Sequence, residues 1–264
     1  MRRRPTSSSS KRRKPISDWL DAAPLVIAHR GASAVAPENT LLAFEQALSL
    51  GADAIELDVK RSRDGEVVCF HDRTLRRTAG EDGTPGGRTL AELRSYDVGV
   101  WMGEAFSGQR VPTLSEVLEA VGRQLLVNIE LTDYWADQPR LAEAVVAVVR
   151  RHRLERRVLV SSFQSSALAA SEARAPEIPR AHLVGPTWLA RRDRLALRRA
   201  EVQAEHLHES LAVPERIAAV QRAGKRVHVY TVDDPEAMKR LWGWGVDGLI
   251  TDVPDVARRM KEAG

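Results

Sequence analysis

Two acidic residues stand two positions apart inside one apolar segment of the chain. Glu56 and Asp58 lie in AIELDV, whose alternation is typical of a β-strand and places both carboxylates on one face. Two like charges in a confined site repel and are costly to desolvate unless protons or a cation neutralise them. A divalent cation is the simplest solution, and with Glu130 from LLVNIEL the all-oxygen ligand set suits Mg²⁺ or Ca²⁺ rather than zinc. An arginine-paired cluster or a solvent-facing edge strand is the structural alternative.

Two histidines each follow an apolar segment directly. His29 comes after LVIA and His71 after VVCF, so both are expected at the same end of the fold. A lone histidine there is more often a core residue, but two imidazoles beside a carboxylate site can exchange protons near neutral pH. Arg30 adds a guanidinium suited to phosphate oxygens. Together these groups indicate phosphoryl chemistry. Structural roles are expected for the other histidines, although two of them stand near a strand end and could contact the site, namely His206 and His208; the remaining three are His152, His182 and His228.

These residues need a fold that brings strand ends together. From Leu25 onward, eight strand-then-helix units follow one another, the number and size typical of a (β/α)8 TIM barrel. A doubly wound open sheet is disfavoured because no glycine-rich dinucleotide motif follows the first strand. The barrel strands are expected at 25–28, 54–59, 125–129, 158–160, 180–184, 202–206, 226–230 and 248–250.

Helical patterns and one irregular segment separate these strands. Helices are expected after Thr40 and Thr113 and then over 141–152, 165–173, 189–199, 214–223, 235–242 and 253–261. The segment 67–70 is expected to form a hairpin with the second strand. Residues 72–112, rich in Gly, Thr and Arg with one short helix near 90–96, are expected to form a small insertion or lid.

The basic charge of the chain is concentrated at its start. Lys and Arg total 40 against 36 acidic residues, but residues 1–14 hold seven of the basic residues and no acid, which leaves 33 against 36. Residues 1–22 are therefore expected to form a disordered basic tail before a phosphodiesterase barrel domain at 23–264. The acidic body argues against nucleic-acid binding, although the tail could contact RNA or acidic lipid.

Other composition features narrow the class of protein further. The single Cys69 excludes an internal disulfide, and no apolar run approaches the roughly 20 residues of a spanning helix. No secretory signal pattern is present, so a cytoplasmic protein is expected, with no oligomeric state indicated.

Four segments in this order resemble glycerophosphodiester phosphodiesterases. They are HRGASAVAPENTLLAFEQAL at 29–48, GADAIELDVKRSRDGEVVCFHD at 51–72, NIEL at 128–131 and GVDGLITDVPD at 245–255. The resemblance implies a barrel with an insertion after the second strand, His29 and His71 as general acid and base, and Arg30 on the phosphate. It also implies Glu56, Asp58 and Glu130 as ligands of one divalent cation, and cleavage of a small phosphodiester to sn-glycerol 3-phosphate and an alcohol. A cyclic phosphate intermediate is expected.

The chain departs from the family pattern at several places. Many relatives carry a lysine where this chain has Thr132, so another cation must substitute or Arg30 and the metal must suffice. The segment YTVD at 230–233 replaces Trp-Thr-Val-Asn. GVDGLITD is expected to close the barrel. Aromatic residues could line the leaving-alcohol site or simply pack the insertion on the barrel; these are Trp101, Phe106, Tyr134 and Trp135.

Other functions fit parts of the same pattern. A lysophospholipase D-like enzyme acting on lysolipids is the alternative enzyme, and chelator-sensitive assays on both substrate classes separate the two. A non-catalytic phosphate-binding barrel and an RNA-associated protein acting through its tail are the alternatives from other classes.

Overall fold

Eight parallel strands close into a barrel in the computed structural model, which describes residues 18–20, 24–132, 138–186 and 200–263. The barrel closes because β1 pairs with both β9 and β2. The strands are β1 (Leu25–Ala28), β2 (Ala54–Arg61), β4 (Leu126–Leu131), β5 (Val158–Ser162), β6 (Arg180–Val184), β7 (Ala204–His208), β8 (Arg226–Tyr230) and β9 (Gly248–Thr251). The predicted (β/α)8 barrel is thus confirmed.

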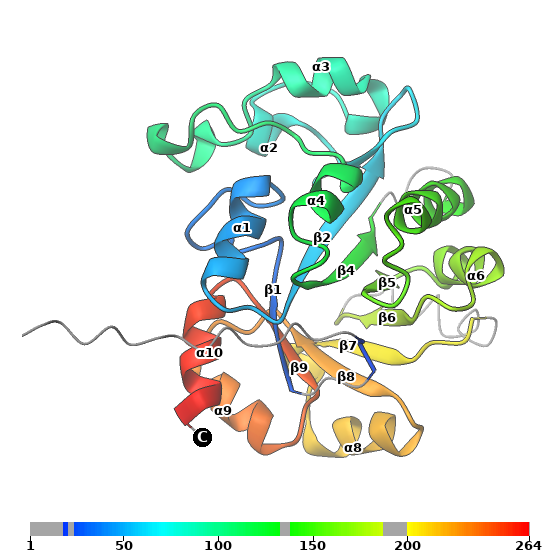
Figure 1. Cartoon of the computed structure of the whole chain (residues 1–264). Helices are drawn as coiled ribbons and strands as arrows, with labels where there is room; N and C mark the ends of the chain where they lie inside the picture. Colours follow the sequence, from blue (N-terminus) through cyan, green and yellow to red (C-terminus); the bar gives the residue numbers. More distant parts are fainter. Residues whose placement is uncertain (1–17, 21–23, 133–137, 187–199, 264) are drawn as a thin grey trace, which may run out of the picture.

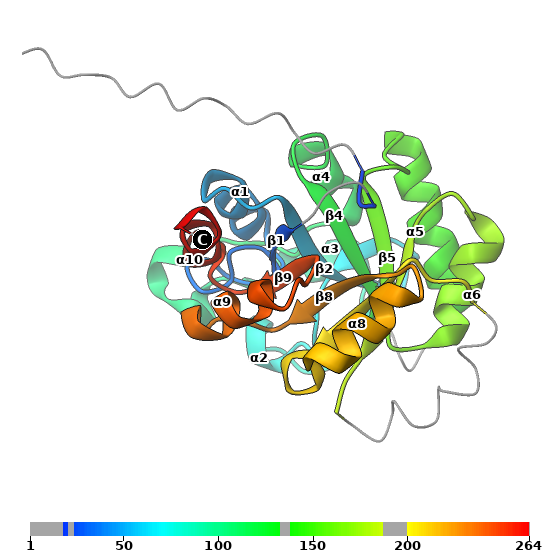
Figure 2. The same cartoon turned by 90° about the horizontal axis from the view of Figure 1, so that it is seen from below.

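Helices surround the barrel (Figures 1 and 2). They are α1 (Leu41–Ser49), α4 (Leu114–Ala120), α5 (Gln138–His152), α6 (Ser165–Arg174), α8 (Pro214–Arg222), α9 (Pro235–Gly243) and α10 (Pro254–Ala263). Several begin at side-chain caps: Thr40, Thr113 and Asp234 each accept a hydrogen bond from a backbone N–H of the first turn. No helix in the described part of the chain is long and apolar enough to cross a bilayer.

The segment after β2 leaves the barrel. Strand β3 (Val67–Cys69) pairs antiparallel with the last residues of β2, as expected for a hairpin. Beyond it come α2 (Arg76–Ala79) and α3 (Leu90–Ser95), with 3₁₀ turns η1 (Pro85–Gly87), η2 (Val100–Met102) and η3 (Glu104–Phe106). Figure 1 shows α2 and α3 at the end of the barrel toward which β2 runs. The sequence showed only one helix here because α2 has a single turn, too short for a periodic pattern.

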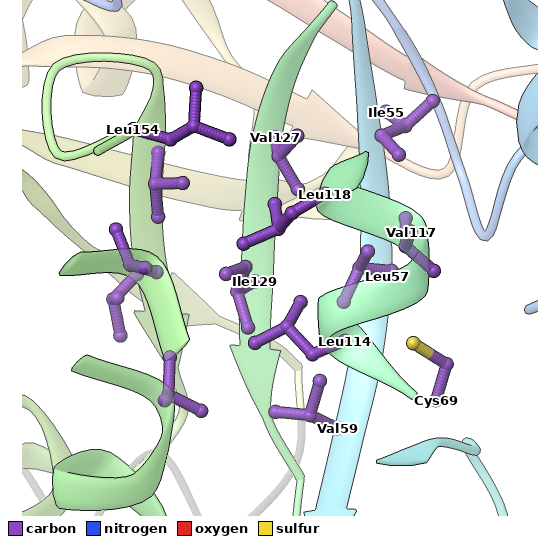
Figure 3. Close-up of a cluster of buried hydrophobic side chains, with 14 of the residues drawn as sticks. Ile55, Leu57, Val59, Cys69, Leu114, Val117, Leu118, Val127, Ile129 and Leu154 are labelled. Atoms are coloured by element: carbon purple, nitrogen blue, oxygen red, sulfur yellow. The ribbon is translucent and has the colours of Figure 1, made fainter. Parts of the chain in front are cut away.

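Side-chain alternation along β2 divides apolar from polar residues. Ile55, Leu57 and Val59 face outward and pack with α4 and β4 residues in one buried cluster (Figure 3). The intervening residues therefore face the barrel interior. These are Glu56, Asp58 and Lys60, all less than 10% exposed. The helices that cover the apolar face thus force the polar face of β2 inward.

Apolar residues fill the opposite, amino-terminal end of the barrel. Trp19 is 1% exposed and packs with Leu25, Ala54 and Leu126. Its Nε1 donates a hydrogen bond to the carbonyl of Arg157. Because this end is plugged, the open end is the carboxyl end of the strands, where catalytic residues of such barrels lie.

Three expectations concern residues that the structure does not describe or places differently. Residues 1–17 and 21–22 of the expected tail and the helix expected at 189–199 lie outside the described residues, whereas Trp19, also expected in the tail, is buried at the end of the barrel. Strand β7 begins at Ala204 rather than at Val202, because pairing with β6 and β8 starts there although Val202 is buried. The shift of two residues keeps the same face inward and brings His208 to the end of the strand.

Two histidines are buried inside the barrel and make stability depend on pH. The His228 Nδ1 lies 3.0 Å from Nε2 of His206, and burial lowers the pKa of His228 to about 4. The unfolded chain, with an ordinary histidine pKa near 6.5, therefore binds more protons between about pH 4 and 6.5. Stability is present above this window and is lost as the pH falls through it.

We expect the free energy of unfolding to be about 2 kcal/mol lower at pH 5 than at pH 7 from His228 alone. Urea denaturation at the two pH values measures it. His228→Gln should flatten this dependence, whereas His152→Gln, on α5, should leave it unchanged. Equal slopes for wild type and His228→Gln would show that His228 does not carry the effect.

Candidate active site

Three carboxylates meet where β2 and β4 run side by side. The register pairs Asp58 with Glu130 and places Glu56 beside Asn128. Glu56, Asp58 and Glu130 each offer an oxygen, and these oxygens lie within 4.8 Å of one another. The structure therefore brings together the three acidic residues singled out from the sequence.

The charges of this cluster are strongly coupled. Burial raises the pKa of Glu56 well above its usual range, and the charges of Asp58 and Glu130 raise it further. Burial also opposes ionisation of Asp58, but the positive charges of Arg30 and His71 and a hydrogen bond from Asn39 outweigh it, so the pKa of Asp58 is lowered. A bound cation would relieve the repulsion that Glu56 experiences.

The cluster fits a divalent cation. The Oε1 of Glu56 is buried without a hydrogen-bond partner among the described residues, while its Oε2 accepts a hydrogen bond from the Arg30 backbone at 3.0 Å. All the possible metal ligands in the cluster are carboxylate oxygens, the ligands that Mg²⁺ and Ca²⁺ prefer. A buried carboxylate oxygen without a partner is costly, and a cation among the three residues would provide one.

His29 is held by an acidic residue from the other end of the chain. Its Nδ1 lies 2.7 Å from Oδ1 of Asp252, directly after β9, and Ser33 Oγ donates to the same oxygen at 2.8 Å. Burial opposes ionisation of Asp252, yet the hydrogen bond and charge of His29 lower the pKa of Asp252. GVDGLITD thus does more than close the barrel.

His71 has an equivalent arrangement. Its Nδ1 lies 2.7 Å from Oδ1 of the neighbouring Asp72. Although burial opposes ionisation, hydrogen bonds from Arg77 and His71 lower the pKa of Asp72 to about 2. Each imidazole is thus fixed through Nδ1, which leaves Nε2 as the atom able to exchange protons.

Arg30 connects the carboxylate cluster to this second pair. Its Nε lies 3.3 Å from Asp58 Oδ2, and its Nη1 donates to Glu38 at 2.9 Å. Glu38 also accepts two hydrogen bonds from Arg77, each 2.8 Å long, and Arg77 donates to Asp72. No spacing pattern predicts the Glu38–Arg77 pair, because its members are 39 positions apart, one in the turn after β1 and the other on α2.

The residue types in the HRG and PENT segments have physical causes in this chain. Gly31 has φ +85°, and a Cβ there would lie 2.6 Å from the Ala43 carbonyl carbon. Asn39 has φ +56°, which asparagine tolerates, and its side chain donates to Asp58 at 2.8 Å. The turn after β1 therefore fixes the position of Asp58.

A cavity of about 800 Å³ lies at the carboxyl ends of the strands. His29, His71 and Glu130 line it, whereas Glu56 and Asp58 are buried next to Glu130 and are not part of the lining. The complete lining consists of His29, Arg30, Lys60, His71, Asp72, Arg73, Thr84, Pro85, Gly86, Glu130, Thr132, Phe163, His208, Tyr230 and Thr231. The cavity therefore joins the barrel residues to the insertion through Arg73 and η1.

The aromatic part of this lining differs from the residues considered in the sequence. Phe163 and Tyr230 follow or end barrel strands and meet edge to face, with ring centroids 6.3 Å apart. Trp101 and Phe106 are not part of the lining; Trp101 packs on the Arg77 guanidinium, 5.5 Å from its ring centroid. Tyr134 and Trp135 lie outside the described residues.

Replacing Asp252 tests whether its carboxylate positions the His29 imidazole. We expect Asp252→Asn to lower kcat about 10²-fold, because the amide no longer fixes the orientation and proton-bearing nitrogen of the imidazole. Asp255→Asn, on the first turn of α10, where the half-buried carboxylate pairs with Arg259 rather than with a histidine, is the matched control. Steady-state kinetics of both variants measures the effect, and an Asp252→Asn enzyme as fast as the control would contradict the role of Asp252.

Comparisons with known proteins show the family to which this chain is similar. The model of the glycerophosphoryl diester phosphodiesterase family matches residues 29–256. A glycerophosphodiester phosphodiesterase of Caldanaerobacter subterraneus is 38% identical, over 91% of this chain and 98% of that protein. One from Bacillus subtilis is 31% identical, over 98% of this chain and 92% of that protein.

Solved structures give the same result. An Oleispira antarctica phosphodiesterase in complex with the product sn-glycerol-3-phosphate superposes with a TM-score of 0.82 at 32% identity, covering 91% of this chain and 97% of that one. A glycerophosphodiester phosphodiesterase from Agrobacterium tumefaciens has a TM-score of 0.74 at 30% identity, covering 88% and 98%. The chain therefore belongs to the glycerophosphoryl diester phosphodiesterase family.

Proposed function

We propose that this enzyme hydrolyses small glycerophosphodiesters to sn-glycerol 3-phosphate and an alcohol, with His29 and His71 as the proton carriers. The observation that carries the proposal is the shared site: two carboxylate-held imidazoles and a three-carboxylate cluster at one cavity. The Oleispira antarctica relative binds sn-glycerol-3-phosphate as its product, which supports the same product here.

Glu56, Asp58 and Glu130 would hold one divalent cation, Mg²⁺ or Ca²⁺. When bound, the cation would offset the negative charge that develops on the phosphoryl oxygens. Arg30 contributes a permanent positive charge at the same place, since its Nε lies beside Asp58. Such preorganised charge stabilisation is usually the largest contribution to catalysis.

The two imidazoles divide the proton transfers between them. One takes the proton from the glycerol hydroxyl that attacks phosphorus, and the other donates a proton to the departing alcohol oxygen. The new P–O bond forms as the bond to the alcohol breaks, which leaves a cyclic phosphate. Water then opens the ring, and the two imidazoles exchange roles, so that both return to their starting protonation states.

The position of the cleaved bond tests this proposal. The full chain should release sn-glycerol 3-phosphate from glycerophosphodiesters with different alcohols, and hydrolysis in ¹⁸O water should place one ¹⁸O in the product phosphate. Lysolipids assayed in parallel identify lysophospholipase D-like activity, the alternative. Turnover of lysolipids alone, or release of free glycerol instead of its phosphate, would refute the proposed substrate and bond.

A further inference from the structure

We propose that Lys60 is a second cationic side chain that binds the substrate phosphate, together with Arg30. The inference rests on the proposed function, because it assigns a further residue to the same site. It arises from two features of this chain: the position of Lys60 on the inward face of β2, and its contact with Thr132, the residue that follows β4.

The alternation of β2 places Lys60 at the site. Glu56, Asp58 and Lys60 share the inward face, and Lys60 lies one inward position nearer the open end of the barrel than Asp58. Lys60 is only 6% exposed, yet it lines the cavity together with both histidines and Glu130. Lys60 therefore places a positive charge at the wall of the cavity.

Thr132 fixes where the ammonium lies. The Lys60 Nζ donates to the Thr132 carbonyl oxygen at 3.0 Å and to its hydroxyl oxygen at 3.3 Å. The Thr132 hydroxyl in turn donates to the carbonyl of Val59 at 3.0 Å, so Thr132 is also hydrogen-bonded to the backbone of β2. Thr132 stands two positions after Glu130, so the ammonium is located on the side of the site where β4 ends.

The charge balance of the cavity favours a second cation. Three carboxylates carry one negative charge more than a divalent ion neutralises. The Arg30 guanidinium is shared with Asp58 and Glu38, so part of its charge is already used. A phosphodiester adds one further negative charge, and its transition state adds more. Lys60 is the buried lysine that lines the cavity, whereas Arg73 is exposed on the insertion.

The Lys60–Thr132 contact also suggests how the charge can be moved. Since Nζ of Lys60 touches the Thr132 side chain, a lysine at position 132 could deliver its ammonium to the same region from β4. The exchange variant Lys60→Thr/Thr132→Lys would keep the composition and the net charge of the chain. It would move the lysine side chain from β2 to the end of β4.

The experiment compares Lys60→Thr, the exchange variant and a matched control, Arg61→Met, which changes the next residue on the opposite face of β2. Lys60→Thr should lower kcat/KM for a glycerophosphodiester about 10²-fold and weaken binding of inorganic phosphate at least tenfold in Mg²⁺ buffer. The exchange variant should recover at least tenfold of the lost kcat/KM. Arg61→Met should match wild type in both measurements.

Phosphate affinity separates this inference from the proposed function. If wild type hydrolyses no glycerophosphodiester, the proposed function fails, and the loss of phosphate binding in Lys60→Thr still decides the role of Lys60. Phosphate affinity and kcat/KM within twofold of wild type would overturn the inference. Lost activity with unchanged phosphate affinity would also overturn it, because Lys60 would then only support the structure. Lys60→Met, which keeps the apolar stem, replaces Lys60→Thr if the latter does not fold.

Discussion

Replacing either of the two proposed proton carriers, His29 or His71, should lower kcat by about 10² to 10⁴, the usual contribution of a positioned acid or base. His29→Gln and His71→Gln are the variants, and glutamine keeps the side chain polar without a titrating group. Both losses should be large because each imidazole transfers a proton in both steps of the proposed reaction. Rapid-quench and steady-state kinetics on one glycerophosphodiester measure them.

The leaving alcohol distinguishes the two histidines. A glycerophosphodiester of p-nitrophenol needs little protonation of the departing oxygen, so the variant lacking the first-step acid should regain much of the rate for ring formation. The other variant should remain slow. His152→Gln, whose imidazole bonds Ser115 on the helical face, is the control. If both variants stayed within tenfold of wild type, neither imidazole would be the proton carrier.

Removing the cation should abolish measurable turnover, with a loss of at least about 10³-fold. Three buried or half-buried carboxylates cannot assist an anionic substrate unless their charge is offset. Dialysis against EDTA followed by addition of Mg²⁺ or Ca²⁺ measures the loss and recovery, and the ion that restores more activity is identified in the same assay.

The variant Asp58→Asn provides the matching change in the protein. It retains the size of the side chain but removes a ligand charge, so calorimetric affinity for Mg²⁺ or Ca²⁺ should fall about 10²-fold, as should activity at limiting metal. Asp82→Asn, on the exposed insertion, should behave as wild type. Turnover that is indifferent to EDTA, or metal affinity unchanged in Asp58→Asn, would contradict the assignment of the carboxylates.

Local pattern was sufficient to predict the barrel and the meeting of its acidic residues. Alternation in a strand fixes the face of Glu56 and Asp58, and parallel strands bring their carboxyl ends to one rim. Glu130 follows because β4 is the parallel neighbour of β2. The roles of these residues remain predictions that the experiments above test.

Contacts between distant loops could not be predicted in this way. Asp252 reaches His29 across 223 positions, and only closure of the barrel by β9 against β1 brings them together. The Glu38–Arg77 pair joins the turn after β1 to the insertion, which has no regular period. Long-range side-chain contacts of this kind depend on packing that a single sequence does not specify.

The place of Lys60 at the rim follows from strand alternation. Lys60 continues the inward series of Glu56 and Asp58 by two positions, so strand alternation alone places it at the rim. Alternation does not predict the contact with Thr132, which locates the Lys60 ammonium beside the end of β4.

Anomalous diffraction from crystals of the full chain soaked in Mn²⁺ shows whether the three carboxylates bind a divalent cation. Mn²⁺ accepts the same oxygen ligands and scatters strongly enough to be located without bias. We expect one strong peak bonded to oxygens of Glu56, Asp58 and Glu130, with the His29 and His71 side chains facing the same cavity. A peak at another position, or none at these three carboxylates in crystals of active enzyme, would contradict this expectation.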